Sequence, residues 1–419
     1  MSNTDTKAVP WYFQVFVVLY AMHFTMPIVG FNTPAIVHAS VLLFLYGFLF
    51  TMGWRTALSD FTKIIPIFAI NILSIVYSGF KDAAVEIYWL LQLMIHPLLA
   101  LYLIRKKDKK AVRRMVIIIG ISFLITAITT YFGCLTYPGA SRDLAAMLST
   151  KDSALYALYM SLNIGSFSFI YAMVLLTPLL IYAIKDKLIK QWIGIVVLII
   201  VVMTIIYSDY ATALLCILIS IIVLFVFPKQ LKSKHFIVMV VVTAVFMYAS
   251  AWLLAPFLDV LGDLIGGELT SARLQELSSF SANEQSYMEG DMEARSNLYM
   301  KSIYSFLSSP VWGSSSAAVG GHSFVFDNMA KFGLIGIVGV IMMFWAIFKY
   351  FYAPFKQQRW YGHILFSFFM VILLAFLNPK DNLSILTFYI PLFCVAFTKK
   401  KILLKKNNLE MKYENTMDC

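Results

Sequence analysis

A histidine that follows two glycines is the clearest candidate for acid–base chemistry in this sequence. His322 comes directly after Gly320 and Gly321 and shortly before a long apolar segment. At a helix N-terminus the helix dipole disfavours the imidazolium ion and so favours a neutral imidazole that can accept a proton near pH 7. Glycines allow the backbone to approach a ligand closely. His322 is therefore a candidate general base. The alternative is a histidine that anchors a helix end at a membrane interface.

Asp327 has two candidate partners. It could orient His322 if the chain around Ser323 is not yet helical. It could instead form an ion pair with Lys331, which lies four residues further along the same helix. The spacing does not decide between these two roles.

Two arginines each begin a helical segment upstream of the histidine. Arg273 and Arg295 could both grip a diphosphate, because a guanidinium offers paired N–H groups that a lysine lacks. The alternative is an ion pair with a neighbouring carboxylate. Glu276 is placed to pair with Arg273, and Glu293 or Asp291 with Arg295.

Metal and nucleotide chemistry have little support in the sequence. Glu289, Asp291 and Glu293 alternate in a stretch that could bind a divalent cation, but a solvated loop is the simpler interpretation. The HExxH, P-loop and GxSxG patterns are all absent. We therefore expect no metal and no cofactor.

The composition indicates that these residues are positioned by helices that span a membrane. The chain has 419 residues, of which 60% are hydrophobic and 13% are charged, whereas a soluble domain carries about a quarter charged residues. The apolar residues form continuous runs of about 20, the length that crosses a bilayer as a helix, and lack the alternation of barrel strands. We expect an all-α polytopic membrane protein. The basic residues lie in short loops between spans, so the net charge of +11 does not indicate nucleic-acid binding.

Twelve transmembrane helices are predicted. They cover residues 11–29, 35–53, 62–79, 84–104, 115–133, 165–184, 191–207, 211–227, 236–255, 325–348, 363–379 and 383–398. Most Lys and Arg residues fall on one side of this map, above all in Arg105–Arg114 and Lys399–Lys406. Because cytoplasmic loops carry the excess of basic residues, both termini are predicted to be cytoplasmic.

Four parts of the chain follow from this map. Residues 1–255 hold the first nine spans and a smaller outer loop at 134–164, residues 256–323 form a large outer loop, residues 324–398 hold the last three spans, and residues 399–419 form a basic cytoplasmic tail. The large loop is too long for a passive connection. We therefore expect the function to lie on the outer face.

The large outer loop contains three predicted helices. An interfacial helix is expected over Phe257–Ile265, followed by helices over Ser271–Phe280 and Glu293–Leu307. In the third helix Leu298, Tyr299, Ser302, Ile303 and Phe306 share one face, and Ser308-Ser309-Pro310 ends it.

Three polar residues lie near predicted spans elsewhere. Asp209, between the seventh and eighth spans, is expected at the outer surface. Glu86 and His96 lie within or near the fourth span, where ionisable groups are functional candidates unless they pair across the bundle.

Three segments of the large loop resemble one family of membrane enzymes. GGHSFVFDNMAKFGLIG at Gly320–Gly336 resembles the block that begins a late span in the O-antigen polymerase and ligase superfamily, in which a histidine and a Ser or Asn precede a helix with a Gly-hydrophobic-hydrophobic-Gly step. RSNLYMKSIYSFLSSPVWG at Arg295–Gly313 is similar to the preceding loop segment of that family. SARLQEL at Ser271–Leu277 looks like polymerase members. About twelve spans with the largest outer loop before the histidine is also the family's topology.

The resemblance implies an inverting glycosyl transfer at the outer face of the bacterial inner membrane. The donor would be a glycan on undecaprenyl diphosphate, His322 the general base, and Arg295 and Arg273 the groups that hold the diphosphate. Asp327 is counted with the catalytic residues, and Tyr299 and Arg142 with the substrate-binding residues. The expected partners are this lipid-linked glycan, the lipid bilayer, a chain-length regulator and a flippase. Such a reaction needs no metal.

One departure from the family pattern favours a polymerase over a lipid A-core ligase. In many ligase members a Ser-Arg pair opens a span before the large loop, whereas this chain has Ser208-Asp209. The Ser that follows His322, in place of the Asn common in ligases, points the same way. A flippase or another secondary transporter is the alternative from a different class. The long outer loop and the scarcity of intramembrane charges count against it.

Overall fold

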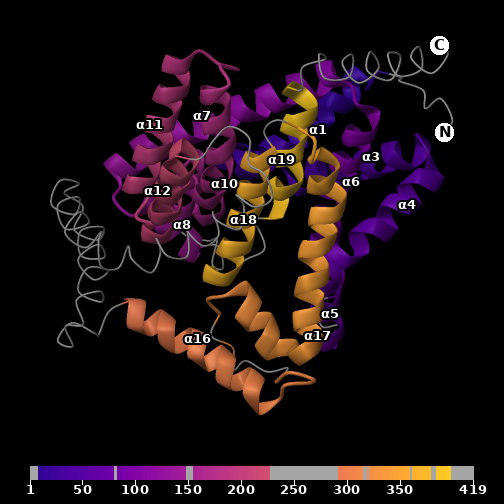
Figure 1. Cartoon of the computed structure of the whole chain (residues 1–419), viewed down its shortest axis with the longest axis vertical. Coiled ribbons are helices and arrows are strands. Elements are labelled where there is room, and N and C mark those ends of the chain that lie inside the picture. The colour runs from indigo at the N-terminus through magenta and orange to yellow at the C-terminus, as the bar shows by residue number, and fades with distance from the viewer. Residues whose placement is uncertain are drawn as a thin grey trace, which may run out of the picture.

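The computed structural model describes residues 8–79, 83–147, 154–226, 291–314, 319, 321–358, 361–378 and 384–397, and over these ranges it is helical without strands (Figure 1). The helices before residue 227 are α1 (Trp11–Thr25), α2 (Pro27–Asn32), α3 (Ala35–Thr51), α4 (Trp54–Ile64), the 3₁₀ turn η1 (Ile65–Phe68), α5 (Ala69–Tyr77), α6 (Ala83–Lys106), α7 (Lys109–Thr136), α8 (Ala140–Met147), α9 (Ala154–Ser161), α10 (Phe167–Lys185), α11 (Gln191–Tyr207) and α12 (Ala211–Val226). The later helices are α16 (Asp291–Ser308), α17 (Phe324–Ile347), the π-helical turn η3 (Phe348–Tyr352), the 3₁₀ turn η4 (Ala353–Phe355), α18 (Tyr361–Leu377) and α19 (Ser384–Phe397).

Several helices are suited to a membrane. Within the described ranges, five are long and apolar enough to cross one: Trp54–Tyr77, Ala83–Lys106, Lys109–Thr136, Phe167–Lys185 and Phe324–Phe355. Shorter apolar helices of 10–17 residues include α3, α11 and α18. The expected class, an all-helical multi-pass membrane protein, is therefore confirmed in this coarse form. The predicted span 236–255, the predicted helices at 257–265 and 271–280, and the basic tail lie outside the described residues, so twelve spans remain a prediction.

The first predicted span is not one continuous helix. The sequence pattern predicts a helix over 11–29, but α1 ends at Thr25 and α2 begins at Pro27. Between them Met26 is extended, with φ −121° and ψ 104°. Proline lacks an N–H and disfavours the helical conformation in the residue before it, which explains the break.

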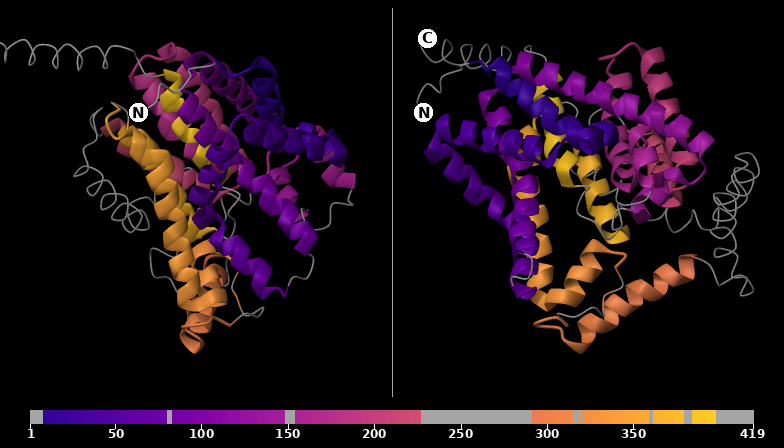
Figure 2. Two further views of the ribbon diagram at one scale, coloured as in Figure 1. Left: turned by 90° about the vertical axis from the view of Figure 1, so that its right-hand side faces the viewer. Right: turned by 180° about the vertical axis from the view of Figure 1, so that it is seen from behind.

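The core of the bundle consists of two sets of packed helices (Figure 2). In the first set α1 packs on α3 and α7, and α6 packs on α3, α4 and α19. Aromatic rings fill this contact: Phe13 stacks on Phe48 with ring centroids 4.0 Å apart and meets Tyr102 edge-on at 5.3 Å. In the second set α10 packs on α11, α12 and α18. The core of the described chain is therefore made from helices that are far apart in sequence.

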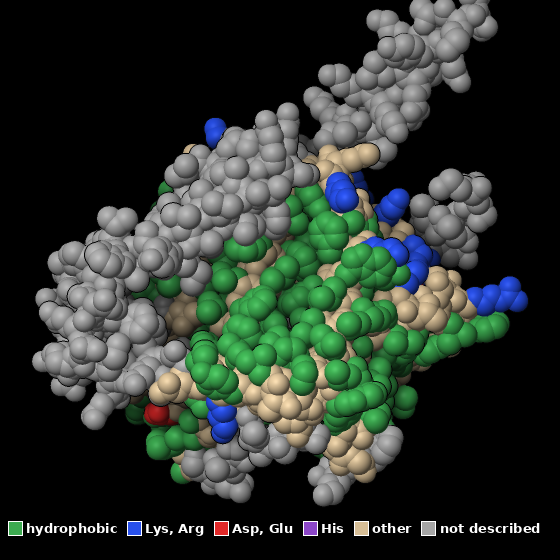
Figure 3. Space-filling view, turned by 60° about the horizontal axis from the view of Figure 1, so that its bottom comes forward, with side chains coloured by type: hydrophobic (Ala, Val, Ile, Leu, Met, Phe, Trp, Pro, Cys, Tyr) green, Lys and Arg blue, Asp and Glu red, His purple; other side chains and the backbone are tan. Residues whose placement is uncertain are grey.

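The exterior carries many large apolar side chains, as a lipid-facing surface does. Trp11, Ile36, Leu43, Trp192 and Ile341 are each more than 60% exposed. In Figure 3 hydrophobic side chains cover the centre of the visible face, and most of the visible Lys and Arg side chains lie toward one side. Such extensive apolar exposure would be unfavourable in water and is expected in a bilayer.

The smaller outer loop folds against the end of α7. Its helices α8 and α9 form a separate small core that includes Cys134, Leu144, Tyr159 and Ile164. Gly133 permits this close packing, because a Cβ there would lie 2.6 Å from the Ile164 side chain. The loop that holds Arg142 is therefore packed onto the bundle.

Asp209 does not lie at the surface as expected. It occupies the tight turn between α11 and α12 with φ 63°, and only 4% of the residue is exposed. The prediction was wrong because hydropathy shows where a span ends but not that α8 packs nearby: Tyr210 donates a hydrogen bond to the Ser141 carbonyl of α8 at 3.1 Å.

Helices α5, α16 and α17 form a distinct end of the molecule. In Figures 1 and 2, α5 runs beside α17, and α16 lies across the end where α17 begins. Gly339 allows α5 to approach α17 closely, since a Cβ on it would lie 2.7 Å from the Ile70 side chain. This end contains the histidine that the sequence singles out.

Candidate active site

The turn that contains His322 is anchored by the carboxylate of Asp327. One oxygen, Oδ1, accepts hydrogen bonds from the Ser302 hydroxyl at 2.7 Å and from the Gly321 N–H at 3.2 Å. The other oxygen, Oδ2, accepts from the Ser323 N–H at 3.2 Å. Asp327 is only 7% exposed. A buried carboxylate that accepts three hydrogen bonds fixes its surroundings firmly.

Of the two roles that the spacing left open, Asp327 takes the one at His322, but through the backbone rather than through the ring. Its carboxylate bonds to the backbone on both sides of His322 rather than to the imidazole, and it is not paired with Lys331, which is exposed. Helix α17 begins immediately after this turn. Ser323 is its N-cap and accepts a hydrogen bond from the Phe326 N–H at 3.2 Å.

The imidazole of His322 is partly exposed and makes no hydrogen bond with the described residues. The turn thus fixes the backbone of His322 on both sides and leaves both ring nitrogens available. Gly321 supports this conformation, because its φ of 76° lies in the left-handed region that favours glycine. A positioned imidazole with unoccupied nitrogens can accept a proton from a bound hydroxyl group.

Three helices meet around this turn. The Tyr299 hydroxyl of α16 donates to the Leu377 carbonyl at the end of α18 at 3.1 Å. The Phe324 N–H of α17 donates to the Asn378 carbonyl at 2.8 Å. Phe326 lies between the two sides, with its ring 6.0 Å from that of Tyr299 and 5.8 Å from that of Phe376. Tyr299, expected as a substrate-binding residue, thus joins α16 to α18.

Two glycines allow the segment that follows α16 to pack closely against a kink in α17. Gly333 has φ 60° and ψ −141° within α17, so the helix is broken there. A Cβ on Gly333 would lie 2.5 Å from the Val311 carbonyl oxygen, and a Cβ on Gly313 would lie 2.1 Å from that of Lys331. The Leu334 N–H donates to the Pro310 carbonyl at 2.8 Å across this contact. The middle of α16 is therefore bonded to the first part of α17 through Ser302, and the segment that follows α16 packs on the kink.

Asn378 is a residue of this region that the sequence did not single out. It is 3% exposed, and its side-chain Nδ2 has no hydrogen-bond partner in the part of the chain that the structure describes. Its carbonyl holds the first residue of α17, so the amide lies next to the His322 turn. A buried donor without a partner is unfavourable by about 1–3 kcal/mol, and a bound ligand would remove that penalty. In the sequence, the only feature that could have indicated Asn378 is its position after a predicted span and before Pro379.

The predicted arginines are not all placed together. Arg295 lies in α16, four residues before Tyr299, although its side chain is outside the described part of the structure. Arg273 lies outside the described residues altogether. Arg142 is half-buried in α8, which packs on α7, α9 and α10 and so belongs to the smaller loop rather than to the α16–α17–α18 junction.

The acidic run is partly helical. Asp291 and Glu293 belong to the first turn of α16 and not to an unstructured stretch, while Glu289 falls outside the described residues. Across the described ranges, no three His, Cys, Asp or Glu side chains are arranged to hold a metal ion.

A cluster of histidines in the bundle was only partly anticipated. His96 is fully buried, and its Nδ1 lies 2.8 Å from the Tyr389 hydroxyl of α19. Of the two alternatives for His96, the structure thus shows a pairing across the bundle. His23 of α1 stacks on His38 of α3 with ring centroids 4.0 Å apart, and the His38 Nδ1 lies 3.1 Å from the Tyr88 hydroxyl. The sequence could have indicated this cluster, because His23, His38 and His96 all lie inside apolar segments.

Comparison with known proteins gives no further assignment: no protein-family model matches the chain, and no curated protein is significantly similar to it.

Proposed function

We propose that this protein is a glycosyltransferase of the bacterial inner membrane that polymerises a surface polysaccharide. It would join repeat units carried on undecaprenyl diphosphate, with inversion at the anomeric carbon, at the periplasmic face. The reaction has an activated leaving group, so the protein mainly needs to position two substrates, accept a proton and stabilise the departing diphosphate.

The observation that carries this proposal is the anchored turn at the start of α17. Asp327 binds the backbone amides on both sides of His322, and among the described residues the imidazole has no hydrogen-bond partner. The bond to the Ser323 N–H also caps α17, whereas the bond to the Gly321 N–H lies before the helix and fixes the turn itself. A general base needs such a fixed turn, because proton transfer requires the acceptor nitrogen within about 3 Å of the attacking hydroxyl.

Each part of the junction has a role in this reaction. His322 takes the proton of the acceptor hydroxyl as that oxygen attacks the anomeric carbon and the bond to the diphosphate breaks. Asp327 positions the turn. Arg295, four residues before Tyr299 in α16, would bind the diphosphate oxygens as a planar fork. The buried Nδ2 of Asn378 would donate to a glycan or diphosphate oxygen.

The experiment that tests the proposal is deletion of the protein in the bacterium that produces it. A polymerase defect leaves surface lipopolysaccharide with a single repeat unit, whereas a ligase defect leaves none. We expect single units, and restoration of the ladder by the wild-type protein but not by His322→Ala at equal abundance. A normal ladder in the deletion strain would contradict the proposal.

Secondary transport is a second candidate, and the buried histidine cluster favours it. Histidines inside a bundle are typical of proton relays in pumps and transporters, and the Nε2 atoms of His38 and His96 are buried without partners among the described residues. The location of the accumulated intermediate separates the two candidates. Without a flippase the lipid-linked repeat unit stays on the cytoplasmic face, whereas without a polymerase single units reach the cell surface.

A further inference from the structure

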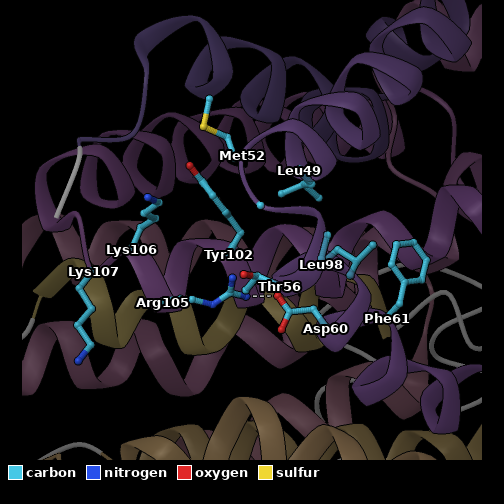
Figure 4. Close-up of a pocket in the computed structure, with 12 residues that line it drawn as sticks. Leu49, Met52, Thr56, Asp60, Phe61, Leu98, Tyr102, Arg105, Lys106 and Lys107 are labelled. Carbon is cyan, nitrogen blue, oxygen red and sulfur yellow. Dashed lines mark hydrogen bonds and ion pairs between the residues drawn. The ribbon is translucent and has the colours of Figure 1, made fainter. Parts of the chain in front are cut away.

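A cavity of about 410 Å³ lies where α4 meets the ends of α3 and α6, apart from the His322 junction. Leu49 and Leu98 contribute apolar wall, and Arg105, Lys106 and Lys107 contribute the basic end. Figure 4 shows Arg105 directed toward Asp60 inside the cavity, with Tyr102 beside Lys106.

The charges around this cavity do not balance. The buried carboxylate of Asp60 binds Lys63 at 2.9 Å and also binds Arg105, so two cations already share one anion. Lys106 and Lys107 line the same cavity and add two more positive charges. Part of the Arg105 guanidinium remains exposed, and a guanidinium has five N–H donors, more than one carboxylate can use. Counted over the described residues, the cavity therefore has a surplus of cations and of hydrogen-bond donors.

The carboxylate of Asp108, which follows Lys107 in the sequence, does not offset these positive charges. Asp108 is directed at backbone amides: its Oδ1 accepts from the Ala111 N–H at 3.1 Å and its Oδ2 from the Val9 N–H at 2.9 Å. These bonds cap α7 and fix the turn between α6 and α7, in which Lys107 has φ 52°. Arg105 and Lys106 are therefore held by the last turn of α6, and Lys107 by a defined turn, and not by a loose loop.

The cavity opens near residues that favour the boundary between lipid and water. Trp54, the first residue of α4, is 58% exposed and has the Arg55 guanidinium 5.4 Å from its ring centroid. Met52 and Leu58 beside it are also exposed. Tryptophan with flanking arginine is enriched at the membrane interface, where the ring sits at the level of the headgroups.

We propose that this cavity binds the phosphate headgroup of an anionic membrane lipid. The apolar wall at Leu49 and Leu98 would contact the glycerol and the start of an acyl chain. Arg105 and Lys106 would hold the phosphate oxygens, and Lys107, whose side chain is directed to the other side in Figure 4, would add positive charge at the rim. Basic pockets between membrane helices bind anionic headgroups in this way. The predicted orientation places the cavity at the cytoplasmic leaflet, where anionic lipids face a basic loop. The proposal is independent of the glycosyl-transfer site.

Thermal unfolding of the purified full-length protein in detergent tests this site. Short-chain phosphatidylglycerol is titrated in, with short-chain phosphatidylcholine and inorganic phosphate in parallel at matched ionic strength. We expect phosphatidylglycerol alone to raise the unfolding temperature in a saturable manner. In Lys106→Gln/Lys107→Gln its half-saturating concentration should rise roughly 30-fold, because each cation near a phosphate surface contributes about 1 kcal/mol.

A charge-matched variant is the control. Lys110→Gln/Arg114→Gln removes the same two charges from exposed positions of α7 that do not line the cavity, so the half-saturating concentration should stay within about twofold of the wild type. Equal weakening in both variants would show a diffuse charge effect and overturn the site. An equal stabilisation by phosphatidylcholine or by inorganic phosphate would overturn the assignment to an anionic lipid.

Discussion

The carboxylate of Asp327 holds the two backbone amides that flank His322 and is not itself bonded to the imidazole. This arrangement differs from the usual pairing of a carboxylate with a histidine ring, in which the carboxylate fixes the tautomer. Here the carboxylate fixes the path of the chain, and the Ser302 hydroxyl ties the same oxygen to α16 at 2.7 Å. Any movement of α16 is therefore transmitted directly to the backbone on either side of the candidate base.

Asp327→Ala is expected to lower both stability and activity. The substitution leaves the buried Ser323 N–H without its acceptor, which is unfavourable by about 1–3 kcal/mol, whereas the exposed Gly321 N–H can bond to water. Asp327→Asn keeps Oδ1 and should lose less. Thermal unfolding of the purified protein measures both effects. Lys331→Gln is the matched control, because Lys331 is exposed. A control as damaged as Asp327→Ala would indicate that an Asp327–Lys331 pair is what matters.

Gly333→Ala is expected to disrupt the attachment of α16 to α17. The new Cβ would lie 2.5 Å from the Val311 carbonyl oxygen, and φ of 60° with ψ of −141° suits only glycine. Backbone strain of this kind amounts to about 1–3 kcal/mol before the clash is added. Gly120→Ala in α7 is the control, because nothing lies within 4 Å of its Cβ position. Unfolding temperatures should fall for Gly333→Ala and stay level or rise for Gly120→Ala. Equal stability of Gly333→Ala and the wild type would contradict the observed contact.

Local features of this region were predictable from the sequence, and its spatial relations were not. Ser308-Ser309-Pro310 marks the end of α16, and the apolar run after His322 marks α17, so the sequence predicts both helices within a few residues. The spacing of Asp327 allowed bonds to His322 or Lys331 but gave no sign that Ser302, 25 residues earlier, would share its oxygen. Contacts between distant segments depend on how the helices pack, and hydropathy does not contain that information.

The predictions at Met26 and Asp209 were both wrong because hydropathy and charge along the sequence do not determine where a helix breaks or which turn is buried. At Met26 the apolar run continues across Pro27, so hydropathy predicted one span where local backbone restriction breaks the helix. At Asp209 the charge indicated a surface turn, whereas the packing of α8 on the bundle buries it. The kink at Gly333 likewise requires knowledge of the Val311 carbonyl that approaches it.

Arg295→Lys is expected to be nearly as damaging as Arg295→Ala. Only a planar guanidinium can hold two diphosphate oxygens at once, so a lysine restores the charge but not the geometry. Polymer length at matched protein abundance is the measurement. Lys301→Ala, an exposed cation of the same helix, should leave polymer length unchanged. Wild-type polymer from Arg295→Lys would show that positive charge alone suffices.

The orientation of the chain is open to direct test. The excess of basic residues predicts both termini in the cytoplasm and residues 256–323 in the periplasm. Alkaline phosphatase fused after Gln285 should be active, and a fluorescent protein fused after Lys405 should fluoresce. Fluorescence from a fluorescent protein fused after Gln285 would show that the orientation is the opposite of the predicted one. The candidate site would then not lie in the compartment where the lipid-linked glycan is presented.

The most direct test of the central claim is the rate of polymerisation by purified enzyme and lipid-linked repeat units, followed against pH for the wild type and His322→Asn. Asparagine keeps a hydrogen bond but has no titratable nitrogen, and general-base catalysis contributes about 10²–10⁴-fold. The proposal predicts that His322→Asn is folded, binds the donor, and loses turnover by that factor. Robust turnover by His322→Asn with the wild-type pH dependence would contradict it and leave His322 as a residue of the membrane interface.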